Sequence, residues 1–221
     1  MKGTPYFLPL SQAVDLTLKH TISCSTEIVD IDDAHQRILA EDLHSKVNDP
    51  GFDNSSMDGF AVIFSDTTKP PVNLTIVGSS NAGTGQLNTI KSGEAVRIMT
   101  GGPLPTGADS IIPIELCDVD NNVVTLNESS KPNYVRKQGE NFAKQQTLFS
   151  TGEVMTPEKI ALCAAAGVAN LTVFGKLKIA IISTGDELKN LDESLDFGQI
   201  YESNSYGIEA LVEVYGHEAI R

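Results

Sequence analysis

Residues 51–62 read GFDNSSMDGFAV, a polar turn that leads directly into an apolar run with the character of a strand. Asp, Asn, Ser and Gly are common turn formers, so most of this segment needs no special explanation. The Met57-Asp58-Gly59 segment is different. It places a carboxylate where a strand begins, and the glycine beside it has no side chain, which leaves room for a ligand at the backbone. Taken alone, the segment fits either a ligand site or an ordinary polar turn.

The charge balance restricts the partners of this chain. Its 221 residues carry 16 Lys and Arg against 29 Asp and Glu, a net charge of −13. Such a field repels nucleic acid and anionic lipid, so we expect neither nucleic-acid nor membrane binding. No apolar run approaches the roughly 18 residues of a membrane span. The three cysteines are scattered without CxxC spacing, which favours reduced thiols and a cytoplasmic location.

The middle of the chain reads as a small β domain. Short apolar runs alternate with glycine-containing turns, which is the pattern of an all-β unit. We predict this domain over residues 47–140. Its expected strands are 60–64, 72–77, 95–99, 110–114 and 122–126.

Helical patterns flank the β domain on both sides. A first helix is expected over 11–20 with Ser11 as its cap, and a second from Asp32, with Ala34, Ile38 and Leu39 as its buried stripe. A third begins at Thr156-Pro157 and stops at Gly167. We therefore predict a discontinuous, elongated α-rich domain made of 1–46 and 141–175, into which a β-barrel-like domain is inserted.

The last part of the chain, 176–221, has the character of a parallel α/β domain. A continuous apolar strand, of the kind buried on both faces, is expected over 177–183. A loop and then a helix from Ser203 or Asn204 to Gly216 follow it. We expect the next parallel strand beyond the chain end, and hence a fragment of a longer protein. The buried face of the helix would carry Ile208, Leu211, Val212 and Tyr215.

Three loops carry groups suited to chemistry. The first holds Asp58. The second is a strand end at Thr100-Gly101-Gly102, where backbone N–H groups and a hydroxyl are available. The third, 183–187, is another strand that runs into a Thr-Gly turn with two carboxylates. Ligands of open α/β sheets bind beyond the carboxyl ends of the strands, where this third loop falls.

These loops belong to a longer collinear pattern. In order, the chain reads RILAED at 37–42, FDNSSMDGFAV at 52–62, VRIMTGGPLP at 96–105, GE at 139–140, STGDEL at 183–188 and GQIYESN at 198–204. Together these stretches closely resemble the molybdopterin molybdenumtransferases, the MoeA family that includes the E domain of gephyrin. The resemblance covers nearly the whole chain.

The resemblance implies a function in molybdenum cofactor biosynthesis. Family members insert molybdate into adenylylated molybdopterin and release AMP with the help of Mg²⁺ or another divalent cation. They are elongated homodimers whose site lies between the α/β domain of one subunit and the β domain of the other. The adenylyltransferase of the same pathway is a candidate partner.

The resemblance also suggests roles for individual residues. Molybdate and phosphate are anions, and carboxylates repel them unless a hard cation intervenes. We assign Asp58, Thr100 and Glu187 as catalytic, with Asp58, Asp186 and Glu187 as metal ligands. A turn-closing role for Thr100 and a capping role for Asp186 are the alternatives. Substrate binding is expected at Ser56, Met57, Gly101, Gly102, Ser183, Thr184, Gly185 and Asn204.

Two observations limit this assignment. The family usually reads Gly-Glu-Asp where this chain has Gly139-Glu140-Asn141, so residue 141 keeps an acceptor oxygen but lacks the carboxylate charge. Family elements that grip pterin and nucleotide do not occur in these residues, so we expect the 221 residues to be inactive alone. A non-catalytic scaffold of the gephyrin type and a molybdate or pterin carrier are the alternative functions.

Overall fold

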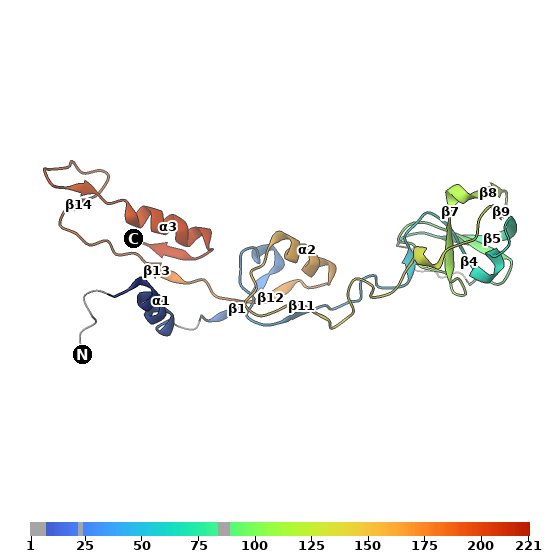
Figure 1. Ribbon diagram of the computed structural model, residues 1–221, viewed down its shortest axis with the longest axis horizontal. Helices are drawn as coiled ribbons and strands as arrows, with labels where there is room; N and C mark the ends of the chain where they lie inside the picture. Colours follow the sequence, from blue (N-terminus) through green and yellow to red (C-terminus); the bar gives the residue numbers. More distant parts are fainter. Residues whose placement is uncertain (1–7, 22–23, 84–88) are drawn as a thin grey trace. The chain divides into compact units, whose positions relative to one another are not determined.

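The computed structural model describes residues 8–21, 24–83 and 89–221 (Figure 1). These residues form two compact units. The first unit comprises Met1–Asp42, Ser150–Ile160 and Asn170–Arg221, and the second, here called the β unit, comprises Leu43–Phe149 and Ala161–Ala169. The three-domain division predicted above stays a prediction.

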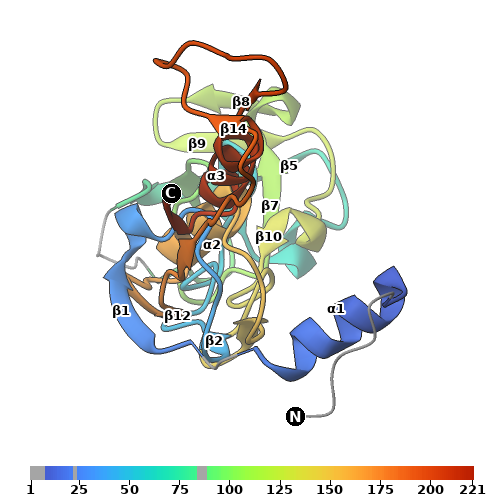
Figure 2. The ribbon, with the colours of Figure 1, turned by 90° about the vertical axis from the view of Figure 1, so that its left-hand side faces the viewer.

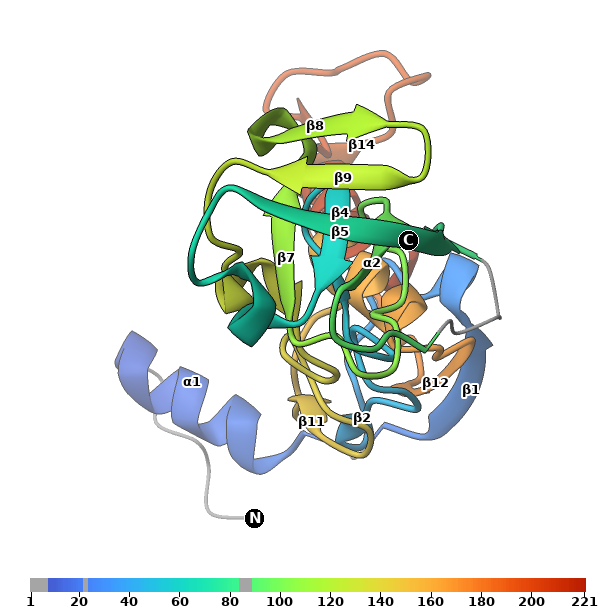
Figure 3. The same cartoon turned by 90° about the vertical axis from the view of Figure 1, so that its right-hand side faces the viewer.

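A six-stranded mixed sheet forms the β unit, in the order β7-β4-β6-β5-β9-β8. All neighbours are antiparallel except β5 and β6, which are parallel. Figure 3 shows β5, β9 and β8 running across β7 and β4, so that the sheet curls into a half-barrel. The strands are β4 (Gly59–Val62), β5 (Val72–Ser80), β6 (Glu94–Ile98), β7 (Ser110–Pro113), β8 (Cys117–Asp120) and β9 (Val123–Leu126).

Strand β4 is an interior strand of the sheet and is packed on both faces. All four of its residues are buried, because alternate side chains enter different clusters. Phe60 and Val62 pack with one set of buried residues, and Ala61 packs with Ile98 and Ile111 in another. Short two-stranded pairs complete the unit: β3 (Asn54–Ser55) with β10 (Val135–Arg136), and β2 (Leu43–His44) with β11 (Thr147–Phe149).

The five predicted strands are present, with shifted ends, but β8 was not predicted. It pairs with β9 as a hairpin in which Asp120 lies opposite Val123. Asn121 turns the chain with a φ of 53°, a left-handed conformation that Asn tolerates. The two asparagines at 121 and 122 form this turn, whereas the prediction placed Asn122 inside a strand.

The first unit contains fewer helical residues than the pattern predicted. Helix α1 (Leu10–Lys19) is present, but Pro9 occupies the N-cap position and no side chain caps it, so the role given to Ser11 is wrong. The helix predicted from Asp32 is also wrong. A single 3-10 turn (Ile31–Asp33) is followed by Gln36 with a φ of 62°, which ends any helix.

The residues assigned to that second helix are buried for another reason. Leu39 forms an isolated bridge with Val173, and its amide donates to the Glu153 carbonyl at 3.0 Å. Beside this segment, β1 (Thr26–Asp30) pairs antiparallel with β12 (Asn170–Phe174), as Figure 2 shows. Tertiary pairing therefore replaces the helix that the spacing of apolar residues suggested.

Helix α2 (Pro157–Ala165) matches the prediction closely. Proline occupies its first position, where its missing N–H would be unpaired in any case. Gly167 ends the helix with a φ of 76°, and the amide of Val168 donates to the Cys163 carbonyl at 2.9 Å. This is the left-handed glycine ending that the sequence indicated.

The C-terminal part of the first unit is a β-α-β arrangement. Strand β13 (Lys178–Ala180) pairs in parallel with β16 (Glu218–Ile220), and α3 (Asn204–Val214) joins them. The second parallel strand thus lies within the chain, not beyond Arg221 as predicted. The two short strands β14 (Leu188–Lys189) and β15 (Ile200–Tyr201) form a separate parallel pair.

The burial expected in this part is only partly present. Lys178 and Ala180 are exposed, so β13 is not buried on both faces. On α3, Val212 is buried, whereas Ile208, Leu211 and Tyr215 are exposed. A two-stranded sheet has little area, and α3 can cover only one of its faces.

Candidate functional site

The first two predicted loops meet at one edge of the half-barrel. Asp58 lies directly before β4, and Thr100 follows β6 closely. The strands are antiparallel with Gly59 opposite Ile98, so the start of one lies beside the end of the other. The Thr100 amide donates to Asp58 Oδ1 at 2.7 Å, and the Thr100 hydroxyl donates to the same oxygen at 2.8 Å.

This double hydrogen bond fixes the charge and orientation of Asp58. Both Asp58 and Thr100 are exposed. The Thr100 amide, then its hydroxyl, and to a smaller extent the charge of Arg97, lower the pKa of the Asp58 carboxyl below its usual value. Among the residues that the structure describes, Asp58 Oδ2 accepts no hydrogen bond. The result is an ionised carboxylate with one oxygen held and one oxygen open.

Gly59 serves packing between strands. A Cβ at this position would lie 2.0 Å from the carbonyl oxygen of Ile112 on β7. The space beside Asp58 is therefore filled by the neighbouring strand, which corrects our interpretation that the glycine leaves room for a ligand. The glycine is still essential for the site, because it lets β4 lie close enough to β7 to position Asp58.

Ser56 and Met57 belong to a tightly bonded turn. The amide and hydroxyl of Ser56 both donate to the Tyr134 carbonyl, at 2.9 and 3.0 Å. The Met57 amide donates to the hydroxyl of Ser55 at 3.1 Å. Ser55 is buried, and sequence reasoning missed its role. A serine followed two residues later by a backbone donor is the sequence signal of such a turn.

The amides of Gly101 and Gly102 are engaged within the protein. The Gly101 amide donates to the Ser55 carbonyl, and the Gly102 amide donates to the Met99 carbonyl, both at 2.8 Å. A Cβ at Gly102 would lie 2.6 Å from the Ser80 carbonyl oxygen. In this conformation the Thr-Gly-Gly turn holds the 52–58 loop, so an oxyanion there would have to displace these bonds.

The third loop borders a pocket at the carboxyl end of β13. Ser183, Thr184 and Asn204, all predicted to bind substrate, line this pocket of about 290 Å³. Glu202 lies in the same lining and was missed by the sequence analysis. Its carboxylate accepts from the Ser183 hydroxyl at 2.9 Å and from the Ser205 amide at 2.7 Å.

Glu202 thereby joins the third loop to the start of α3. The Ser205 hydroxyl, followed by the Ser205 amide, lowers the pKa of the Glu202 carboxyl. The carboxylate supplies the bond at the helix start that Ser203, the N-cap residue, does not make. The available sequence signal was the position of Glu202, three residues before Ser205 in the first turn of the predicted helix.

Gly185, Asp186 and Glu187 form an exposed turn after this strand. The carboxylate of Glu187 folds back over Gly185, so that a Cβ on Gly185 would lie 2.5 Å from Glu187 Oε2. Asp186 is exposed beside it. The exposed Glu187 side chain could move aside, so it is the φ of 156° at Gly185 that favours glycine at this position.

The acidic residues do not form a closed metal site. Within residues 8–21, 24–83 and 89–221, no group of three or more His, Cys, Asp or Glu side chains is placed to hold a metal ion. The open oxygen of Asp58 and the exposed carboxylates of Asp186 and Glu187 are nonetheless hard oxygen donors. Mg²⁺ commonly binds through one or two carboxylates, with water and substrate phosphate as its other ligands. These carboxylates fit a Mg²⁺ ion that is bound partly by substrate and water, and not a metal site made of protein ligands alone.

Asn141 bridges two charged residues near the 52–58 loop. Arg136 donates to its Oδ1 at 3.2 Å, and its Nδ2 donates to Asp49 at 2.7 Å. Lys137 pairs with Asp53 at 2.8 Å, and this hydrogen bond is the main cause of the lowered pKa of Asp53. An amide can donate and accept at once, so Asn141 has a defined structural role.

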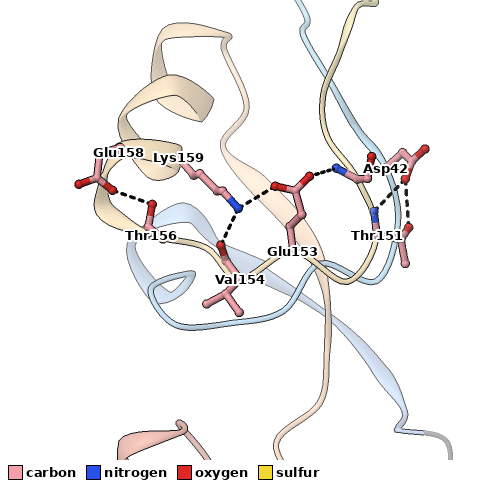
Figure 4. Close-up of polar contacts among 8 residues, drawn as sticks. Asp42, Thr151, Glu153, Val154, Thr156, Glu158 and Lys159 are labelled. Carbon is pink, nitrogen blue, oxygen red and sulfur yellow. Dashed lines mark hydrogen bonds and ion pairs between the residues drawn. The ribbon is translucent and has the colours of Figure 1, made fainter.

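A second carboxylate cluster stabilises the turn before α2 (Figure 4). Glu153 accepts from Lys159 Nζ and from the Ser150 amide, both at 2.7 Å. The Asp42 carboxylate accepts from the amide and hydroxyl of Thr151, at 2.8 and 3.2 Å. The Glu153 contacts close the turn locally, and Asp42 attaches the turn to a segment 109 residues earlier in the chain, so we assign the cluster to stability.

Comparison with known proteins agrees with the loops described above. Residues 8–167 match the family model described as the MoeA N-terminal region, domains I and II. The chain belongs to the MoeA family. The match includes the Asp58 and Thr100 loops and stops before the third loop, at 183–187.

No helix in the described part of the chain is long and apolar enough to cross a membrane.

Individual MoeA relatives extend the match toward the third loop. A molybdopterin molybdenumtransferase of Haemophilus influenzae is 38% identical over 197 residues, which cover 88% of this chain and 48% of that protein. The Bacillus subtilis protein of the same name is 34% identical over 213 residues, covering 92% of this chain and 49% of its own length. The chain thus spans about half the length of these curated relatives.

A solved structure confirms the fold. The crystal structure of a molybdopterin biosynthesis MoeA protein from Pyrococcus horikosii superposes with a TM-score of 0.84 at 34% sequence identity. The superposition covers 96% of this chain and 56% of that one. The half-barrel and the flanking elements are therefore those of a MoeA fold.

Proposed function

We propose that this chain acts in molybdenum cofactor biosynthesis, as part of an enzyme that inserts molybdate into adenylylated molybdopterin and releases AMP. Family membership and the names of the relatives support the reaction. The structural observation that carries the proposal is the Asp58 carboxylate, which Thr100 holds through two hydrogen bonds and which keeps one oxygen open.

The open oxygen suits Asp58 to a site for anionic reactants. A divalent cation, when bound, would supply charge that brings phosphate and molybdate oxygens to an acidic site and polarises them. Asp58 and Glu187 are the residues proposed to hold it, with Asp186 as an additional ligand. Thr100 fixes the direction of the open oxygen, and its hydrogen bonds further favour the ionised form by lowering the pKa of Asp58.

The third loop is proposed to bind substrate. Ser183, Thr184 and Asn204 present hydroxyl and amide groups to one pocket, and Glu202 holds the Ser183 hydroxyl in place. Gly185 completes the turn. Ser56, Met57, Gly101 and Gly102 are proposed to contact substrate from the β unit, where their bonded backbone gives the loop a fixed shape.

The proposal includes assembly as a homodimer in the cytoplasm. Asp58 belongs to the β unit and Glu187 to the first unit, each on an exposed loop. We propose that Asp58 of one subunit and Glu187 of the other act on the same substrate molecule. The adenylyltransferase of the pathway would deliver the adenylylated pterin. Because the relatives are about twice as long, we propose that the 221 residues alone do not turn over.

A chimeric enzyme tests this function. The matched stretch of the Haemophilus influenzae protein is replaced by this chain, and molybdenum insertion and AMP release are measured with Mg²⁺. We expect Asp58→Asn and Glu187→Gln to lower turnover by about a hundredfold, as removal of one electrostatic contact does at other sites. Asp120→Asn, the same chemical change on the β8–β9 hairpin, should leave it unchanged. Equal turnover in all four proteins would exclude the proposed roles.

A further inference from the structure

Arg97 is a cation whose hydrogen-bonding groups are unused. It lies on β6 directly opposite Phe60 of β4, and its guanidinium stacks over the Phe60 ring, 5.2 Å from the ring centre. The side chain is half-buried. Within the part of the chain that the structure describes, no group accepts a hydrogen bond or forms an ion pair with this guanidinium.

The charges around Arg97 place it beside the proposed site. Asp58 directly precedes β4, whose Phe60 lies opposite Arg97, and its Oδ1 accepts from Thr100, three residues after Arg97, so both residues belong to the same pair of adjoining strand ends. The charge of Arg97 favours the ionised forms of both Asp58 and Cys117. Burial nevertheless raises the pKa of the Cys117 thiol to about 11, so this neighbour stays neutral. Near the thiol, Glu115 and Asp118 supply the remaining charges.

Stacking on Phe60 explains the position of the Arg97 side chain, but it leaves the N–H donors of the guanidinium without a role. A cation above an aromatic ring is attracted by the ring face, a contact that uses none of the N–H groups. The edges of the planar guanidinium remain available. Their fork geometry matches the paired oxygens of a phosphate or a similar tetrahedral oxyanion. The charge of Arg97 cannot be lost at physiological pH, so the donors stay active.

We propose that Arg97 is a substrate-binding residue that holds a tetrahedral oxyanion, a phosphate or molybdate group, beside the open oxygen of Asp58. This inference rests on the proposed function and adds a contact that the sequence motif did not indicate. It also explains how a chain of net charge −13 accepts an anion near a carboxylate. Arg97 attracts the anion directly, while Asp58 is left for the cation.

Binding of the inorganic anions tests the proposal without turnover. Phosphate and molybdate are titrated into the full 221-residue chain with and without Mg²⁺ by calorimetry, and the Thr100 amide is followed by NMR. We expect millimolar binding that shifts the Thr100 amide. Arg97→Gln should weaken it at least tenfold, and Arg97→Lys, which keeps the charge but loses the fork, several-fold. Lys91→Gln removes the same charge from an exposed turn and should have little effect.

The outcomes separate this proposal from the proposed function. Equal anion affinity in wild type and Arg97→Gln would overturn the role of Arg97. So would the absence of binding by wild type at anion concentrations about tenfold above the expected millimolar range. An equal loss in Lys91→Gln would show only a general charge effect and would overturn it too. If Arg97→Gln unfolds, the Arg97→Lys comparison decides. The chimera's turnover with Asp58→Asn reports on the proposed function independently, whatever Arg97 does.

Discussion

Replacing Gly59 with alanine should destabilise the β unit strongly. The added Cβ would lie 2.0 Å from the Ile112 carbonyl oxygen, 1.4 Å short of the 3.4 Å at which ordinary contact begins. The atoms in the way belong to the backbone of β7, so no side chain can rotate to make room. Strands β4 and β7 must therefore separate, and the hydrogen bond from the Ile114 amide to the Asp58 carbonyl, 3.0 Å long, must stretch.

Two contributions set the size of this effect. Overpacking of a well-packed core costs about 1–3 kcal/mol. A buried backbone group that loses its partner costs about 1–3 kcal/mol more. We expect Gly59→Ala to lower the free energy of unfolding by about 2–6 kcal/mol, a large part of the roughly 5–15 kcal/mol typical of a domain. The change should also move Asp58 away from Thr100 and thereby raise its pKa toward the usual value.

Chemical denaturation monitored by circular dichroism measures the difference. Gly51→Ala is the matched control, because a Cβ there would lie 3.9 Å from the nearest atom, the Asn48 carbonyl oxygen. That control should stay within about 0.5 kcal/mol of wild type, as surface substitutions do. A Gly59→Ala protein with wild-type stability would show that β4 and β7 do not approach as closely as described, and the packing argument for this glycine would be wrong.

Three further predictions concern single contacts. Thr100→Val removes the hydroxyl but keeps the amide, so the pKa of Asp58, followed by NMR, should rise part of the way to its usual value. Lys159→Met removes the main cause of the lowered pKa of Glu153. Above pH 4.5, the usual pKa of that carboxyl, wild type should therefore be more stable than the variant. This difference in stability should disappear as the pH falls through the lower pKa that Glu153 has in the folded protein. Leu126→Ala, at a fully buried position, should cost about 2–5 kcal/mol of unfolding free energy.

Each of these three variants has a control substitution of the same chemical type. Thr100→Ser keeps a hydroxyl and should preserve the pKa of Asp58. Lys144→Met removes an exposed lysine and should leave the pH dependence of unfolding as in wild type. Val123→Ala changes a residue that is 39% exposed on the same strand as Leu126 and should cost far less. Identical behaviour of a variant and its control would contradict the contact concerned.

The sequence predicted best those elements that local chemistry determines. Pro157 and Gly167 mark the two ends of α2, and both act as their residue types require. The strands of the half-barrel followed from apolar runs between glycines. The helix from Asp32 failed because Leu39 is buried by pairing with Val173, a contact across more than a hundred residues that spacing alone cannot reveal.

In the candidate site, too, features set by local chemistry were predicted and features set by tertiary contacts were not. The Asp58 and Thr100 loops were found from their motifs, but their hydrogen bond depends on the register of β4 and β6. Ser55 and Glu202 were missed because their roles are to bond neighbouring backbone and hydroxyl groups. Gly59 was found for the wrong reason, since only the three-dimensional structure shows the carbonyl of Ile112 beside it.

The central claim is that Asp58 and Glu187 from two different subunits serve one substrate. Mixing the Asp58→Asn and Glu187→Gln chimeras tests it directly, because each variant alone is expected to turn over about a hundredfold more slowly than wild type. If the residues come from different subunits, every mixed dimer contains one intact site, and random mixing restores about a quarter of wild-type molybdenum insertion. If both residues of a site come from one subunit, no intact site forms. Activity that stays at the level of the separate variants would contradict the account.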